Sequence, residues 1–160
     1  MELIFSLSFK FTFTFNLSCV FNQPELSIYN KLVKLSQYYN SIIFVSLHFT
    51  LPVSYKKPLI ADFFVLFKIN NKIHFSIIEY DGPSHYNSNY YRFNIDSIKR
   101  DIIKNNFCKN NNISILRVFD TDTNYFNKIT VFIESIISNN GNAIFDIPND
   151  TFYNNLLKIG

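Results

Sequence analysis

Two apolar runs that carry carboxylates constrain this chain more than any other feature. Residues 60–67 read Ile-Ala-Asp-Phe-Phe-Val-Leu-Phe, and residues 73–81 read Ile-His-Phe-Ser-Ile-Ile-Glu-Tyr-Asp. Runs of this kind are typical of buried strands, and burying a carboxylate in one is costly unless a positive group compensates its charge. A divalent cation compensates several carboxylates at once. The pattern therefore favours a metal-dependent phosphodiesterase as the first hypothesis.

The spacing of these acids predicts where they meet. Successive side chains of a strand alternate between its two faces, so Glu79 and Asp81 share one face and Tyr80 takes the other. If the strand of Asp62 pairs beside them, three carboxylates converge at one edge of a sheet. Such oxygen donors, with the Tyr80 carbonyl, suit Mg²⁺ or Mn²⁺. The alternative is that these acids lie in exposed turns or pair with Lys and Arg.

Hydrophobic periodicity predicts one domain over residues 1–160 with a mixed sheet flanked by helices, an α/β or α+β class. Residues 7–17 alternate as an N-terminal strand, Pro24 opens a helix that reaches about residue 39, and Asn70-Asn71 is a hairpin turn between two antiparallel strands. The other expected elements are strands at 42–51, 60–67, 73–81 and 113–118 and helices at about 94–111 and 125–138, followed by a less regular tail from residue 139.

The charge and the cysteines bound the function classes. Residues 56–117 carry a local net charge of +5, whereas the rest of the chain carries −2. A basic centre fits a polyanionic partner, although a solvated mixed surface explains the charge equally well. Cys19 and Cys108 form no zinc motif or disulfide framework, so we expect a reducing, intracellular location, in the cytoplasm or nucleus of a host cell. Neither a signal peptide nor a transmembrane segment is expected.

The order of these motifs resembles the PD-(D/E)XK restriction-endonuclease-like superfamily, within it the relatives of the very-short-patch repair endonuclease and the EDxHD homing endonucleases. The resemblance covers about residues 25–120, with an αβββαβ core, and is carried by Asp62, residues 78–82, His85-Tyr86, and the segments 99–108 and 115–117. It implies a Mg²⁺-dependent DNA endonuclease of the repair, recombination or homing type. Asp81 stands where many members carry the lysine that helps to position the attacking water.

The resemblance also assigns roles to single residues. Asp62 and Glu79 take the two acidic positions of the motif, His85 is the candidate general base, and Glu25 matches an upstream acid, unless it only complements the helix dipole. Phosphate contacts are expected from Lys99, Arg100, Lys104 and Arg117. Either Asp96 or Asp101 is expected to orient His85 or a basic side chain, although a helical pair of Asp96 with Arg100 is the simpler account.

Two other function classes stay open. The protein is alternatively a non-catalytic nucleic-acid-binding module that kept the fold, which the missing lysine favours, or a structural subunit of a larger particle. A test of nuclease activity on DNA distinguishes the endonuclease from the binding module. A test of nucleic-acid binding distinguishes both from the structural subunit. The sequence does not specify whether the substrate is duplex, mismatched or branched DNA. The resemblance also allows a homodimer, because enzymes of this fold that cut both strands often work as dimers.

Overall fold

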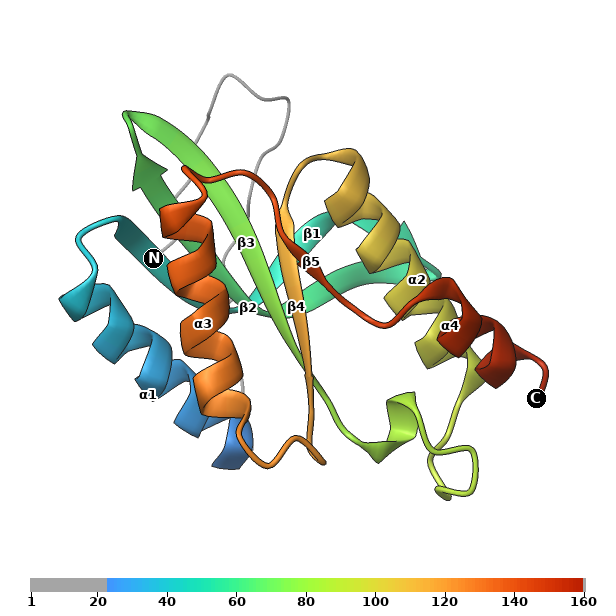
Figure 1. The fold of residues 1–160 in the computed structure, drawn as a ribbon. Coiled ribbons are helices and arrows are strands. Elements are labelled where there is room, and N and C mark those ends of the chain that lie inside the picture. Colours follow the sequence, from blue (N-terminus) through green and yellow to red (C-terminus); the bar gives the residue numbers. More distant parts are fainter. Residues whose placement is uncertain (1–22, 160) are drawn as a thin grey trace.

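The computed structural model describes residues 23–159, so the strand expected at residues 7–17 lies outside the described residues. Five strands form one mixed sheet, which Figure 1 shows between two layers of helices. The prediction of an α+β fold with a mixed sheet flanked by helices is confirmed. Helices α1 (Gln23–Tyr38) and α3 (Tyr125–Ser138) cover one face, and α2 (Ile95–Asn110) and α4 (Asp150–Leu157) cover the other.

The sheet has the order β1-β2-β3-β4-β5. Strands β1 (Ile42–Tyr55), β2 (Lys57–Ile69) and β3 (Lys72–Asp81) are antiparallel neighbours, and β4 (Ser114–Phe119) and β5 (Phe145–Asp146) add in parallel. Asn70 and Asn71 both have positive φ angles, as a tight hairpin turn requires, so the predicted turn between β2 and β3 is confirmed.

Strand β1 is longer than the sequence predicted, because Pro52 does not end it. The register between β1 and β2 shifts between Thr50 and Ser54, and pairing resumes at Ser54 with Pro58. Pro52 therefore lies in an irregular stretch where the ladder does not need its missing N–H group. The turn that joins β1 to β2 follows at Lys56, which has a φ of 59°.

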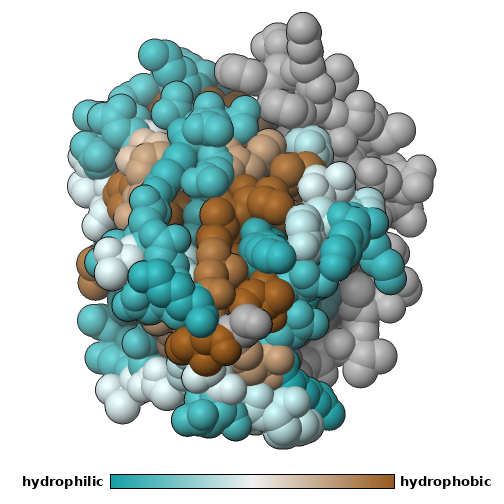
Figure 2. Space-filling model, turned by 90° about the vertical axis from the view of Figure 1, so that its right-hand side faces the viewer, coloured by the Kyte–Doolittle hydropathy of each residue, from teal (hydrophilic) through white to brown (hydrophobic). Residues whose placement is uncertain are grey.

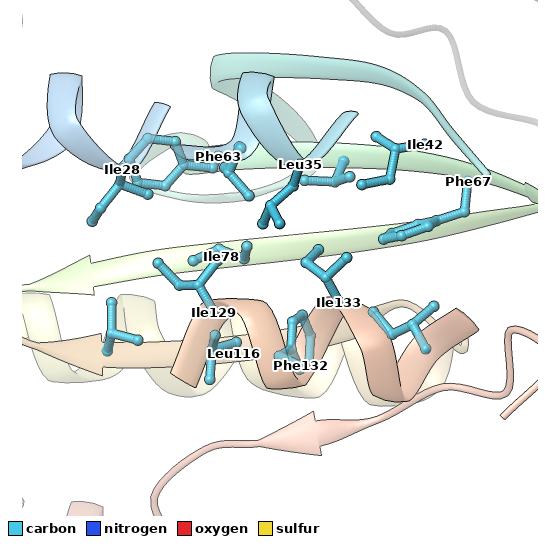
Figure 3. Close-up of a cluster of buried hydrophobic side chains, with 14 of the residues drawn as sticks. Ile28, Leu35, Ile42, Phe63, Phe67, Ile78, Leu116, Ile129, Phe132 and Ile133 are labelled. Carbon is cyan, nitrogen blue, oxygen red and sulfur yellow. The ribbon is translucent and has the colours of Figure 1, made fainter. Parts of the chain in front are cut away.

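The main core lies between α1, α3 and the sheet. Figure 3 shows Ile28 and Leu35 of α1 facing Phe63 and Phe67 of β2, with Ile129 and other α3 side chains on the opposite side of the cluster. A second core lies between α2 and the other face of the sheet and includes Phe49, Ala61 and Cys108. Burial of these aliphatic and aromatic groups is the main stabilising term of the fold.

The β1–β2 hairpin changes its inward face at the level of His48 and Asp62. Leu47 and its partner Phe63 pack into the α1–α3 core, whereas Phe49 and its partner Ala61 pack into the α2 core. His48, with a φ of 49°, lies between the two levels on β1. Asp62 lies between them on β2 and is thereby placed at a bend of the sheet rather than on a regular strand face.

Candidate functional site

Asp62 lies where β2 separates from β3. The ladder between these strands runs from the pair Ile69–Lys72 to the pair Phe63–Ile78. It therefore ends at Phe63 and does not reach Asp62, the adjacent residue. There the Tyr80 backbone N–H donates to the Asp62 carboxylate at 2.8 Å. Burial, together with the neighbouring charge of Glu79, raises the pKa of Asp62 to about 8. Asp62 therefore holds a proton at neutral pH unless a cation joins it.

Glu79 lies on β3 opposite this bend and forms an ion pair with Lys104 of α2. Its side chain is 1 % exposed, and Lys104 of α2 donates to Glu79 Oε2 and to the Ile60 carbonyl, the latter at 3.3 Å. Glu79 Oε1 is buried and has no hydrogen-bond partner among the described residues. Burial lowers the pKa of Lys104, but the charges of Glu79 and Asp62 outweigh it and leave the pKa raised. Lys104 therefore stays protonated beside an incompletely bonded carboxylate.

Arg117 of β4 is the centre of a second, fully bonded cluster. Its Nη1 donates to both Asp81 oxygens at 2.8 and 2.7 Å, its Nη2 to Asp101 Oδ1 at 3.1 Å, and its Nε to Asn105 Oδ1 at 3.0 Å. Burial raises the pKa of Asp101, but Arg117 and His85 outweigh it and lower the pKa to about 2. Asp101 is therefore ionised, and Arg117 pairs with both carboxylates inside the protein.

His85 follows β3 in a single 3-10 turn, Pro83–His85, and is held by Asp101. Its Nδ1 lies 2.8 Å from Asp101 Oδ2 and 3.5 Å from Asp81 Oδ1. Burial lowers the pKa of His85, but the bond to Asp101 and the two carboxylate charges outweigh it and raise the pKa above its ordinary value. The expectation that Asp96 or Asp101 orients His85 thus resolves to Asp101.

The group of close donor atoms differs from the set of acids expected to bind a metal. Asp62, Glu79 and Asp81 are not a group with donor atoms within 4.8 Å of one another, and Asp81 is bonded to Arg117 of β4. Among residues 23–159, one group of three has its donor atoms within 4.8 Å of one another, namely Asp81, His85 and Asp101. Its donor atoms and spacing could hold a metal ion. Arg117 already compensates both of its carboxylates, so a cation there competes with a buried guanidinium.

Two of the four expected phosphate-binding residues are buried instead. Arg117 is 1 % exposed and Lys104 is 7 % exposed, and both are engaged with carboxylates. The assignment of these two to phosphate contacts does not fit their positions. Lys99 and Arg100 are exposed on α2, and Arg100 donates to the Ser97 hydroxyl at 2.9 Å.

The remaining accessory acids lie outside both clusters. Asp96 accepts from Tyr55 Oη at 2.9 Å and pairs with Lys56 at 2.5 Å, so the helical pair with Arg100 does not form. Glu25 on α1 lies 3.5 Å from His48 Nε2, on the opposite layer from α2. Three tyrosines, Tyr86, Tyr90 and Tyr91, lie between His85 and α2. Tyr86 packs against Phe119, whereas Tyr91 is 78 % exposed.

A cleft of about 490 Å³ opens beside these clusters, between the β1–β2 turn and α2. His85, Asp101 and Lys104 line it, together with Lys56, Lys57 and Arg100. Sequence patterns did not identify Lys56 and Lys57 as cleft residues, although the segment Lys56-Lys57-Pro58 lies just before the apolar run that holds Asp62. They also did not identify Asn105. A second signal was the polar series on α2, where the residues that turn out to be buried are Ser97, Asp101, Lys104, Asn105 and Cys108.

Residues 57–154 match the model of a family of unknown function, DUF5889. That match covers more than half of the chain. The protein is a member of the DUF5889 family. The matched segment begins with β2 and includes both carboxylate clusters and most of the cleft lining, whereas α1, β1 and the cleft residue Lys56 precede it. No curated protein and no solved structure matches the chain. Within residues 23–159, no helix combines the length and the apolar character needed to cross a bilayer.

Proposed function

We propose that this DUF5889 protein is a metal-dependent phosphodiesterase that acts on nucleic acid, with Asp62 and Glu79 as metal ligands. The observation that carries the proposal is Lys104, which brings an ammonium group to Glu79 beside Asp62. The resemblance expects a lysine two positions after the second acid, where this chain has Asp81. Lys104 reaches Glu79 from α2, so its ammonium group takes the place of the lysine that the motif lacks.

The charge balance supports a cation at this pair. Asp62 and Glu79 carry two negative charges when ionised, and Lys104 supplies one positive charge. The raised pKa of Asp62 and the unbonded Glu79 Oε1 are both signs of this deficit. Mg²⁺ binds through one or two carboxylates and keeps several waters, so the pair fits this ion or Mn²⁺. When bound, such an ion lowers the pKa of water and stabilises charge on phosphate.

The other groups around the cleft have roles that follow from their contacts. Asp101 fixes the His85 ring, so that His85 can transfer a proton at the cleft. Lys104 holds Glu79 in place and adds positive charge beside the two carboxylates. Lys99 and Arg100, which remain exposed, are the expected contacts to the nucleic-acid backbone. DNA is the proposed nucleic acid.

The test combines metal binding with cleavage. Calorimetry with Mn²⁺ should show binding to the parent and to the exposed-acid control Asp146→Asn, and no binding to Asp62→Asn or Glu79→Gln. Supercoiled, nicked, mismatched and branched DNA should be cleaved only with Mg²⁺ or Mn²⁺. If both site variants bind Mn²⁺ as the parent does, the ligand assignment is wrong.

Two further variants separate catalysis from simple ion pairing. Lys104→Gln removes the competing positive charge, so it should bind Mn²⁺ more tightly than the parent yet cleave more slowly. His85→Ala should cleave about 10²- to 10⁴-fold more slowly, which is the usual cost of losing a proton-transfer group, and should still bind Mn²⁺. Parent-like cleavage by His85→Ala would assign proton transfer to another group.

A second candidate function is a nucleic-acid-binding module without catalytic activity. The observation that favours it is the Arg117 cluster, in which Asp81 and Asp101 are satisfied without a metal. This candidate predicts DNA binding with no Mg²⁺-dependent cleavage on any of the four substrates. A protein that neither binds nor cleaves nucleic acid would instead support a structural subunit.

A further inference from the structure

The cleft beside the site is bounded by two elements that are tied together. Asp96, near the start of α2, accepts from Tyr55 Oη and pairs with Lys56, which stands at the β1–β2 turn. Beyond this tie, the cleft extends along Leu59 and Ile60 toward Lys104. Its volume of about 490 Å³ lies in the range of small-molecule pockets. A cleft bounded in this way at one end can receive a compact chemical group, but not a continuous double helix.

Two acids of the cleft lining, Asp96 and Asp101, are already paired with Lys56 and Arg117, and the rest of the lining combines two kinds of surface. Tyr55, Leu59 and Ile60 supply aromatic and aliphatic contacts, and Ile60 is 50 % exposed. Lys57 and Arg100 bring positive charge to the rim, and both are exposed. Figure 2 views the molecule from the side of α2 and α4, and it shows hydrophobic residues gathered in a central band with hydrophilic residues on both sides.

A nucleotide has the same two parts, because its base is flat and largely apolar on its faces and its phosphate is anionic. We infer that the cleft between the β1–β2 turn and α2 receives one unpaired nucleotide, and that the nucleic acid acted on has a single-stranded position beside the cleaved bond. This inference rests on the proposed function, since it names the substrate class of that site. A paired base is held in its stack, and extruding it costs a few kcal/mol, least where it is already unpaired.

The binding test is done in EDTA, so that it does not depend on a metal or on cleavage. Fluorescence anisotropy compares three labelled probes: a single strand, a fully paired duplex, and the same duplex with one unpaired nucleotide. The parent should bind the single strand and the bulged duplex at least about tenfold more tightly than the paired duplex, a difference of about 1.4 kcal/mol.

Two pairs of variants locate the effect. Ile60→Glu places a negative charge in the cleft and should abolish the preference, whereas Ile43→Glu makes the same change at an isoleucine of similar exposure, 47 %, and should keep it. Lys57→Gln with Arg100→Gln should weaken the single-strand affinity and lower its salt dependence. Lys72→Gln with Lys109→Gln removes the same charge at exposed positions outside the cleft and should leave both unchanged.

Equal affinity for paired and unpaired probes would overturn the inference, and so would a preference that survives Ile60→Glu. Thermal midpoints within a few degrees of the parent establish that the variants are folded. The two proposals fail separately. Metal-dependent cleavage without the preference removes only this inference, whereas the preference without cleavage on any substrate supports this cleft in a binding module and removes the proposed catalysis.

Discussion

Two pairs of carboxylates lie where α2 packs against the sheet, and their charges are compensated differently. Asp81 and Asp101 share Arg117 and His85, and the pKa of Asp101 falls to about 2. Within residues 23–159, Lys104 is the one cation beside Asp62 and Glu79, and the pKa of Asp62 rises to about 8. The first pair is complete without any ligand. The second lacks one positive charge, which a proton supplies at neutral pH and which a metal ion would supply by displacing that proton.

From this difference we propose that the Arg117 pair is structural and that Asp62 and Glu79 are the reactive pair. A buried pair that the protein satisfies itself resists both protonation and metal binding, because either one must displace an existing bond. A pair left short of charge binds whatever cation is available. The donor geometry alone favours Asp81, His85 and Asp101, whereas the charge balance favours Asp62 and Glu79. The predictions below separate these two readings, beginning with the largest effect.

Removing Arg117 should damage the fold most. Arg117→Met leaves Asp81 and Asp101 buried without their cation, and the loss of one partner of a buried pair typically costs about 3–5 kcal/mol. Urea unfolding at pH 7 should show this loss, and Arg92→Met, at an exposed position, should stay within about 0.5 kcal/mol of the parent. A stable Arg117→Met protein would show that the complete pair is not structural.

Asp62 should make the stability of the metal-free protein fall as pH rises. The unfolded chain ionises this group near pH 4, whereas the folded protein keeps its proton to about pH 8, so the folded state binds more protons in between. We expect a loss of about 2–3 kcal/mol between pH 4 and pH 8, less than the full shift implies because the effective dielectric is high. Unfolding in EDTA should show that Asp62→Asn lacks this slope. A parallel pH profile for the two proteins would contradict the prediction.

Asp101 should act in the opposite direction, at lower pH. Because its folded pKa is about 2 and its unfolded value is near 4, the stabilisation is present above pH 4 and is lost as pH falls toward 2. The loss should amount to about 2 kcal/mol. Chemical shifts of the Asp101 carboxyl carbon should still report the ionised form at pH 3.5. A midpoint near 4 would place Asp101 outside the influence of Arg117.

The smallest effect should come from Tyr153 of α4. Its hydroxyl accepts from Asn105 Nδ2 at 3.0 Å, and Asn105 in turn accepts from Arg117 Nε. Tyr153→Phe removes one buried hydrogen bond, so it should cost about 1 kcal/mol of unfolding free energy. Thermal unfolding of this variant beside Tyr91→Phe, at a ring that is 78 % exposed, provides the comparison. Equal midpoints would mean that Asn105 finds another partner.

The fold was largely predictable because its signals are local. Apolar alternation, the Asn70-Asn71 turn and the helical stripes each depend on a few neighbouring residues. Pro52 was the exception, since the irregular pairing that accommodates it depends on the partner strand. Strand β5 and helix α4, in the tail from residue 139, were not predicted, because the first is two residues long and the second has eight.

The pairing of charges was less predictable, because it depends on how α2 is rotated against the sheet. The spacing of Asp96, Arg100 and Lys104 suggested one shared face, but only Lys104 points to Glu79. Asp101 lies three residues before it and faces Arg117. A rotation of one residue position exchanges which acid meets which base, and no local pattern determines that rotation. The presence of a charged site was thus predicted, whereas its internal connections were not.

The contact between Tyr153 and Asn105 also sets an order of events during translation. Every other member of the buried network precedes Tyr153 in the chain, so the network exists as polypeptide before the helix that covers Asn105 has been made. Until α4 docks, the Asn105 amide must bond water instead of the Tyr153 hydroxyl. Domains generally fold as units as synthesis proceeds. The last bond of the charged network can therefore form only after residue 153 has been made, and we expect a nascent chain that ends before residue 150 to leave the Asn105 amide in water.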